Sequence, residues 1–234
     1  MREIPELGQD ECREELTPGG FAIFQKRSGF RFGTDAVALA DFACQNGAGD
    51  NVLDLCTGSG IIPVLLAEQG FSHISGLEIQ PEIADMARRS VRHNGLEDRI
   101  EIKTGDLRKG TAYYPPHSFR TVTCNPPYME AGANLQNETD AKTIARHEIC
   151  CTLEDVIRTA AELLLFRGSF FLVHQPRRLA DIFCLMRSYS LEPKLLQTVH
   201  GRAGQAASLV LVKGVYRGGR ELRMLPPRIL GKEE

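Results

Sequence analysis

The stretch NVLDLCTGSGIIPVLLAEQG, residues 51–70, decides the fold. Its first six residues are mostly apolar and form a segment short enough for a buried strand, whereas residues 61–70 fit a buried helix. Gly58 and Gly60 stand between the two segments, where the chain has to turn sharply. A strand joined to a helix by a tight glycine turn opens a strand–helix–strand unit, which predicts a parallel sheet.

The same alternation continues to the end of the chain. Further strands are expected at 73–79, 99–106, 119–125, 169–175, 192–200 and 207–216, and helices at 81–95, 153–168 and 176–190. The polar connection at 201–206 is too short for a crossover helix, so the last two strands should pair antiparallel. The sequence therefore predicts an α/β protein with a Rossmann-like, seven-stranded, mostly parallel sheet that ends in an antiparallel hairpin.

Residues 1–48 precede the first strand of this sheet. Residues 1–18 are interpreted as an acidic arm, and the alternating segments 21–25 and 29–33 predict a hairpin. Residues 34–46 have helical spacing, with Thr34 as the expected N-cap. We expect residues 1–48 to form an arm, a hairpin and a helix cap, and residues 49–234 to form one compact unit.

Composition is that of a soluble globular protein, with 42% hydrophobic and 25% charged residues. No apolar run reaches the length of a membrane span, and the acidic N-terminus lacks the apolar core of a secretory signal. A cytoplasmic location is therefore expected. The seven cysteines include no CxxC pair and the six histidines show no ligand spacing, so we expect reduced thiols and no metal.

Charge is distributed unevenly along the chain. Residues 1–140 carry a net charge of −8, and residues 141–234 carry +6. A basic C-terminal part is compatible with a nucleic-acid partner, and equally with an ordinary solvated surface.

Acidic residues follow the predicted strands around the glycine turn. Asp54 precedes the turn, Glu78 closes the second strand and Asp106 closes the third. A carboxylate at Glu78 can accept both hydroxyls of a ribose, and one at Asp106 can accept from an adenine amino group. No glycine follows Gly60 where a pyrophosphate would need close approach to the backbone. The negative charge of Asp54 is also unfavourable for a phosphate group. The pattern favours S-adenosylmethionine (SAM), a phosphate-free cation, over a dinucleotide.

Four motifs between residues 33 and 128 resemble those of class I SAM-dependent methyltransferases. They are DLCTGSG (54–60), GLEI (76–79), TGD (104–106) and NPPY (125–128). The family usually has glycine where Cys56 stands. The resemblance implies that residues 49–234 form a methyltransferase domain and that the segment before the first strand closes over the methionine end of SAM. The implied cofactor contacts are Gly33, Thr34, Asp35, Asp54, Cys56, Thr57, Gly58, Gly60, Glu78, Ile79, Asp106, Leu107 and Asn125.

The NPPY tetrad in this family implies methylation of a planar, conjugated nitrogen, either an exocyclic amine of adenine or guanine or a glutamine amide. Such a nitrogen is a poor nucleophile because its lone pair is delocalised. The Asn125 side-chain oxygen and the Pro126 carbonyl would accept its two N–H groups, and Pro127 adds stiffness. The Tyr128 ring would stack on a flipped base, worth on the order of 1–3 kcal/mol.

Residues 29–42, 145–148 and 195–214 resemble a narrower family, the bacterial enzymes that methylate N(6) of adenine 37 in a valine tRNA. This likeness covers nearly the whole chain from about residue 16 and implies tRNA as the partner. The candidate RNA contacts are Arg146, His147, Arg202, Arg220 and Arg223, although a solvated surface remains the plain alternative. A monomer or weak homodimer is expected.

Three other functions remain open. Protein glutamine methyltransferases of the release-factor type normally have a separate N-terminal helical domain, whereas only about fifty residues precede the first strand here. An rRNA or DNA amino-methyltransferase is compatible with the tetrad, but no large insertion for reading DNA sequence is visible. A protein that binds SAM without catalysis would not need the intact residues 125–128.

Overall fold

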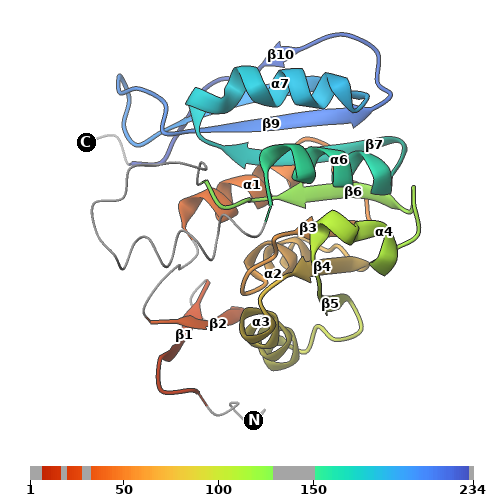
Figure 1. The fold of residues 1–234 in the computed structure, drawn as a ribbon. Coiled ribbons are helices and arrows are strands. Elements are labelled where there is room, and N and C mark those ends of the chain that lie inside the picture. The colour runs from red at the N-terminus through yellow and green to blue at the C-terminus, as the bar shows by residue number, and fades with distance from the viewer. Residues whose placement is uncertain (1–6, 17–19, 28–32, 129–150, 232–234) are drawn as a thin grey trace, which may run out of the picture.

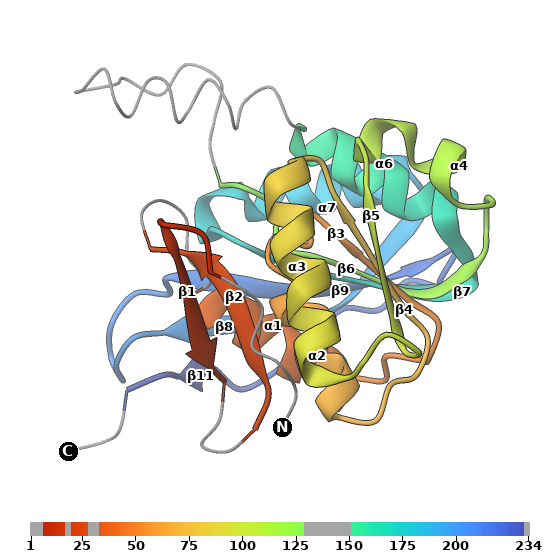
Figure 2. The same ribbon diagram turned by 90° about the horizontal axis from the view of Figure 1, so that it is seen from below.

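The computed structural model describes residues 7–16, 20–27, 33–128 and 151–231. Within them a nine-stranded sheet has helices on both faces (Figures 1 and 2). The strand order is β10-β8-β9-β7-β6-β3-β4-β5, with β11 also paired to β8. The expected Rossmann-like α/β architecture is therefore confirmed.

The seven predicted strands are all present in this sheet. They are β3 (Val52–Leu55), β4 (Ile74–Glu78), β5 (Ile100–Thr104), β6 (Phe119–Cys124), β7 (Leu164–His174), β8 (Leu191–His200) and β9 (Leu209–Tyr216). Strands β3 to β7 run parallel, and β9 lies antiparallel between β7 and β8, as the short connection at 201–206 predicts. Two short strands not expected from the sequence, β10 (Arg223–Met224) and β11 (Arg228–Ile229), pair with β8 in parallel.

Two hydrophobic clusters, one on each face of the sheet, assign the helices to the two faces. The first face carries α1 (Thr34–Gln45), α2 (Ile61–Glu68) and α3 (Pro81–Asn94), and the second carries α4 (Gly110–Tyr113), α6 (Leu153–Leu163) and α7 (Leu179–Ser188). Short 3₁₀ turns, η1 (Leu107–Lys109) and η2 (Pro176–Arg178), follow β5 and β7. Helix α3 begins at Pro81 and ends at Asn94, and the C-cap residue Gly95 has a left-handed φ of 65°.

Two local predictions around the helices are wrong. The helix expected to continue to Gly168 ends at Leu163, and β7 begins at Leu164 because Leu164 pairs with Phe119 at the start of β6. Thr34 is the first residue of α1 rather than its N-cap. Gly33 takes the N-cap position with no side-chain hydrogen bond.

The N-terminal hairpin also differs from the prediction. Its strands are β1 (Glu11–Glu15) and β2 (Ala22–Lys26), so part of the expected arm is a strand, and the expected second strand at 29–33 falls largely outside the described residues. Figure 2 shows this hairpin beside α3, with which it makes specific contacts. Arg89 of α3 binds Glu11 at 2.7 Å, and the Phe24 ring meets the His93 ring edge-on at 5.4 Å. Hence tertiary contacts, rather than local turn signals, determine where the hairpin forms.

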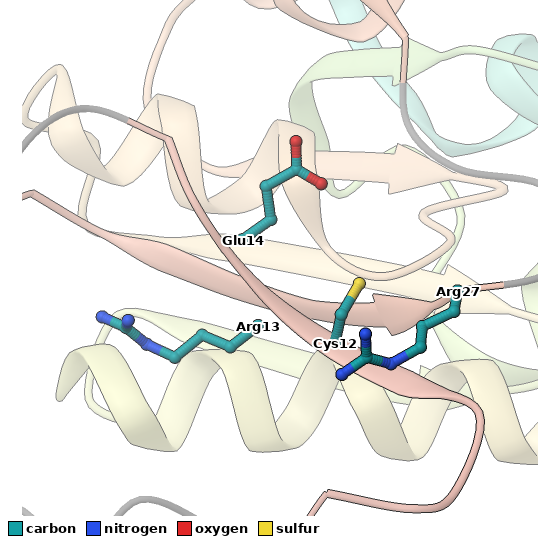
Figure 3. Close-up of a pocket in the computed structure, with 4 residues that line it drawn as sticks. All are labelled: Cys12, Arg13, Glu14 and Arg27. Carbon is teal, nitrogen blue, oxygen red and sulfur yellow. The ribbon is translucent and has the colours of Figure 1, made fainter.

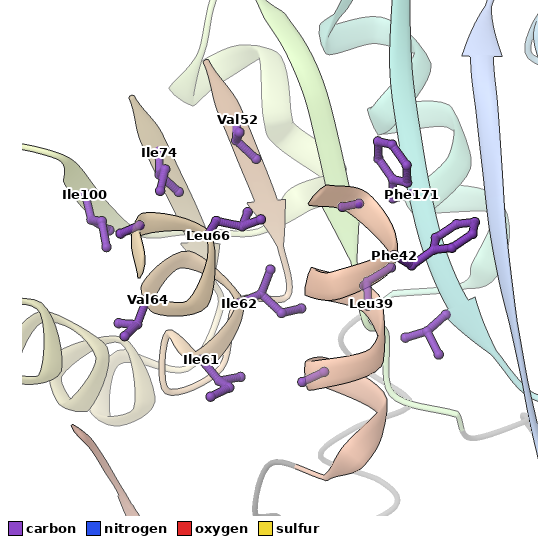
Figure 4. Packing of buried hydrophobic residues seen from close by; sticks show 14 of the residues in the cluster. Leu39, Phe42, Val52, Ile61, Ile62, Val64, Leu66, Ile74, Ile100 and Phe171 are labelled. Carbon is purple, nitrogen blue, oxygen red and sulfur yellow. The ribbon is translucent and has the colours of Figure 1, made fainter. Parts of the chain in front are cut away.

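The cluster on the first face fixes α1 and α2 against the strands (Figure 4). The rings of Phe42 in α1 and Phe171 in β7 meet edge-on, with centroids 5.9 Å apart, and both side chains are fully buried. Leu39 lies beside them, while Leu66 of α2 packs with Val52 of β3. This packing holds the start of α1 at a set position relative to the ends of the parallel strands.

We expect Phe171→Ala to lower the free energy of unfolding by about 3–5 kcal/mol, because it leaves a cavity in a closed core. Phe166→Ala in the same strand is the matched control, since Phe166 is 66% exposed and its loss should change stability by less than about 0.5 kcal/mol. Urea denaturation followed by circular dichroism measures both. Equal effects of the two substitutions would contradict this account of the core.

Candidate functional site

The carboxyl ends of β3, β4, β5, β6 and β7 lie at one edge of the sheet because these strands run parallel. In open α/β sheets, ligands bind at this edge. Asp54, Glu78, Asp106 and Asn125 lie in or just after four of these strands. The structure therefore brings together four residues that the sequence could place only one strand at a time.

The glycine turn between β3 and α2 contains three residues with left-handed backbones: Cys56 and Gly58, each with φ of 56°, and Gly60 with 85°. A Cβ on Gly58 would meet nothing within 4 Å, so this side of the turn is open. Gly60 instead faces Ala87 of α3, where a Cβ would lie at 3.3 Å. A non-glycine residue such as Cys56 in this conformation costs on the order of 1–3 kcal/mol. This cost explains why glycine is usual at this position in class I SAM-dependent methyltransferases.

Glu78 at the end of β4 is 5% exposed and is held by backbone amides. The Gly58 N–H donates to its Oε2 at 3.0 Å, and the Gln80 N–H donates to its Oε1 at 3.0 Å. Burial raises the pKa of this carboxyl. The Ile79 N–H and the Gln80 side chain also interact with this carboxyl and act to lower its pKa, so much of its hydrogen-bonding capacity is used within the protein.

Asp54 is fully buried and turned inward. It accepts hydrogen bonds at 2.7 Å from the hydroxyls of Thr57 in the glycine turn and Thr123 in β6. Burial raises its pKa to about 7. Asp54 therefore joins β3, the turn and β6.

Asp106 and its neighbours follow β5. The Arg108 guanidinium binds the Asp106 carboxylate at 2.7 Å and holds the pKa of that carboxyl below its usual value. Leu107 is buried, with its carbonyl accepting from the Thr159 hydroxyl, and Ile79 is half-buried after β4. Arg108 was not expected from the sequence, and its backbone N–H and guanidinium together donate to both oxygens of Asp106.

The NPPY tetrad meets the start of α1 through hydrogen bonds across 90 positions of the chain. Asn125 Nδ2 donates to Asp35 Oδ2 at 3.0 Å. The Tyr128 hydroxyl lies 2.7 Å from Asn125 Oδ1 and 3.1 Å from Asp35 Oδ2. Between Asn125 and Tyr128 in the sequence, Pro126 is buried and Pro127 is half-buried. Gly33 and Thr34 are exposed. The tetrad and the segment before the first strand thus form one constellation.

His174 at the end of β7 was not identified from the sequence as a site residue. It is 4% exposed, and its ring lies edge-on to Tyr128 with centroids 5.2 Å apart. Its Nδ1 accepts from the Gln175 N–H at 2.8 Å. Its position at the carboxyl end of β7, the strand next to β6, is the sequence signal that could have identified His174.

Thiols lie beside the glycine turn. Cys56 Sγ and Cys151 Sγ are 3.9 Å apart, and Cys124 is fully buried at the end of β6. Burial raises the pKa of Cys124, which keeps that thiol protonated. The six cysteines among the described residues are all free.

Among the described residues, the candidate RNA contacts are separated in space. Arg146 and His147 lie outside the described residues. Arg202 is exposed in the loop after β8, whose end lies at the same edge as the end of β7. Arg223 pairs with Leu195 in the middle of β8, and Arg220 precedes it, so both lie farther from this edge.

Two hollows on the described surface are lined by residues away from the carboxyl ends of the parallel strands. One, of about 310 Å³, is lined by Cys12, Arg13, Glu14 and Arg27 of the hairpin (Figure 3). The second, of about 430 Å³, is lined by residues of β1, α1 and α2. None of the predicted site residues lines either hollow.

Among the helices that the structure describes, none is both long and apolar enough to cross a membrane. Within the same part of the chain, no group of three His, Cys, Asp or Glu side chains is placed to hold a metal ion.

Known proteins resemble this chain in both sequence and fold. A family model described as a methyltransferase domain matches residues 52–147. The tRNA1(Val) (adenine(37)-N6)-methyltransferase of Porphyromonas gingivalis W83 is 31% identical over 185 residues, which cover 76% of this chain and 72% of the relative. That of Aeromonas salmonicida is 29% identical over 194 residues, covering 82% and 79%.

A solved structure shows the same fold. The crystal structure of a predicted O-methyltransferase, protein Atu636 from Agrobacterium tumefaciens, matches with a TM-score of 0.67 and 25% identity. The match covers 84% of this chain and 87% of that chain. The fold agrees with the sequence relatives, and their similarity places the chain in the family of tRNA1(Val) (adenine(37)-N6)-methyltransferases.

Proposed function

We propose that this protein transfers a methyl group from SAM to the exocyclic nitrogen, N(6), of adenine 37 in a valine tRNA. The observation that carries the proposal is the position of Asn125, with its amide held by Asp35 at the sheet edge where Glu78 and the glycine turn also lie. The relatives named above support adenine in tRNA as the substrate.

The residues at the edge fit SAM, which when bound supplies an electrophilic methyl group on a positively charged sulfur. Glu78 would hold the ribose hydroxyls with its remaining acceptor positions, and Asp106 the adenine amino group. Gly58 leaves the turn open, because a Cβ there would project into empty space. Ile79 and Leu107 supply apolar surface after β4 and β5. The absence of phosphate-binding glycines after Gly60 agrees with a ligand that has no pyrophosphate.

Asn125 and Pro126 solve the problem of a poorly nucleophilic amine. Their oxygens would accept the two N–H groups of the adenine amine, so that its lone pair points at the methyl carbon. Positioning of this kind contributes roughly 7–11 kcal/mol. The amine becomes acidic only as the new bond forms, so no strong base is required, and the Tyr128 ring would stack on the flipped base.

Under this proposal the partner is tRNA, and the protein acts in the cytoplasm as a monomer or weak homodimer. Residues 49–234 form the methyltransferase domain, and residues 1–48 cap it. Arg202 would contact RNA near the site, and Arg220 and Arg223 would contact it farther away. Arg146 and His147, which lie outside the described residues, are further candidate contacts. Phosphate contacts of this kind weaken steeply with salt.

Radiolabelled SAM offered separately to unmodified tRNA, rRNA, DNA and release factor tests the function. We expect label in tRNA, and N(6)-methyladenosine when that tRNA is digested and examined by mass spectrometry. Label in release factor but not in tRNA would refute the proposal in favour of glutamine methylation.

Asn125→Ala should reduce turnover by about 10²–10³-fold, the usual loss for one preorganised hydrogen-bonding group at a reacting centre. The affinity for SAM should change far less, because the amide acts on the amine. Single-turnover kinetics and calorimetry measure the two quantities. Equal losses in both would show that Asn125 serves mainly to bind the cofactor.

Glu78→Gln should weaken SAM binding by about 10–100-fold, since hydrogen bonds to a charged group are worth about 1.5–3 kcal/mol. The amide would also place a donor against a backbone N–H. Glu82→Gln is the control, because Glu82 is exposed in the first turn of α3 and should bind SAM as the unaltered protein does. Unchanged affinity in Glu78→Gln, measured by calorimetry, would remove this residue from the cofactor site.

A further inference from the structure

We infer that Asp35 is a positioning residue for methyl transfer, which orients the Asn125 amide and gives the Tyr128 hydroxyl a second acceptor when the adenine amine arrives. This inference rests on the proposed function. It assigns Asp35 a task different from the cofactor contact that the sequence resemblance implies.

The orientation of the Asn125 amide decides whether it can accept an N–H from adenine. A side-chain amide can exchange its oxygen and nitrogen by a half-turn, and only the oxygen can accept an N–H from adenine. Asn125 Nδ2 donates to Asp35 Oδ2 at 3.0 Å, so the carboxylate selects the useful orientation. The opposite orientation would place the amide oxygen against a carboxylate and present a donor to the amine.

Asp35 is itself fixed by α1. Its Oδ1 accepts from the Ala36 N–H at 2.9 Å, in the first turn of this twelve-residue helix, where the helix dipole favours a negative charge. A Cβ on Gly33 would lie 2.7 Å from Oδ1, although the Gly33 backbone is extended. A larger residue at 33 would therefore push the Asp35 carboxylate away from the position in which it meets Asn125.

The Tyr128 hydroxyl has one proton and two possible acceptors. It lies 2.7 Å from Asn125 Oδ1 and 3.1 Å from Asp35 Oδ2, and it can donate to only one of them at a time. Donation to Asn125 occupies one of the two acceptor positions of the oxygen that the adenine amine needs, and it weakens that oxygen as an acceptor. Rotation of the O–H toward Asp35 frees this position and leaves the hydroxyl hydrogen-bonded.

The surroundings of Tyr128 keep this exchange local. The His174 ring lies edge-on to the Tyr128 ring at 5.2 Å and limits how far that ring can move. Burial, together with the nearby Asp35 carboxylate, raises the Tyr128 pKa, so the hydroxyl keeps its proton. The proton therefore changes acceptor while no covalent bond forms or breaks.

The test uses the full-length protein with SAM and tRNA both saturating. Single-turnover methyl transfer is measured for Asp35→Ala, Asp35→Asn, Tyr128→Phe and the double variant Asp35→Ala/Tyr128→Phe. Asp35→Ala should be slower by about 10²-fold, the loss typical of a misplaced reacting group, while its SAM affinity by calorimetry changes little. Asp35→Asn keeps one acceptor and should recover part of the rate.

The double variant gives the decisive result. In Asp35→Ala the Tyr128 hydroxyl has lost its alternative acceptor and stays on Asn125, so removing that hydroxyl should make the double variant faster than Asp35→Ala. A role in folding or cofactor binding does not produce this rescue. Asp41→Ala, on the same helix with a side chain 41% exposed, is the matched control and should retain the full rate.

Two results would overturn the inference: weaker SAM binding by Asp35→Ala with a normal rate at saturation, or a double variant no faster than Asp35→Ala. Calorimetric SAM binding and circular dichroism show that each variant is folded, and Asp35→Asn supplies the comparison if Asp35→Ala is not. If the unaltered protein methylates DNA or release factor instead of tRNA, the proposed function fails, while the same rate ratios on that substrate still decide the role of Asp35. A protein that methylates none of the substrates contradicts both.

Discussion

The buried carboxylate of Asp54 joins the parts of the site. It accepts from Thr57 on the glycine turn and from Thr123 on the strand that leads into the tetrad. A buried carboxyl is costly unless hydrogen bonds compensate it, so the two hydroxyls and the carboxyl stabilise one another only in this arrangement. Through them, the glycine turn and the strand that leads into Asn125 are joined by hydrogen bonds to one carboxyl group.

A second constraint comes from the packing of α1, which precedes the main sheet in the sequence, against that sheet. Packing of Phe42 against Phe171 fixes α1 on the sheet, and this places Asp35 at hydrogen-bond distance from Asn125. The reacting end of the site is therefore built from a helix that precedes the first strand of the main sheet and a turn that follows the fourth. Under the proposed function neither part is sufficient alone, because the tetrad would supply the acceptor and α1 would determine which way that acceptor faces.

Several features of the fold follow directly from local sequence. The strand at 51–56, the glycine turn and the Pro81–Gly95 helix were predictable because burial periodicity and turn chemistry act over a few residues. Errors occur where a distant contact decides. The helix at 153–163 ends before Leu164 because Leu164 pairs with Phe119 in the sheet. The N-terminal hairpin forms where Glu11 and Phe24 contact Arg89 and His93 of α3.

The sequence by itself determined the type of fold, the edge at which the site lies and the chemical groups present there, since each of these depends on residues close together along the chain. Only the tertiary structure decided what those groups face. Asp54 turns inward to two threonines, Asp106 is bound by Arg108, Asp35 holds Asn125, and His174 lies against Tyr128. Most of these partners come from separate strands and helices, so their pairing depends on how the elements pack, which no local pattern records.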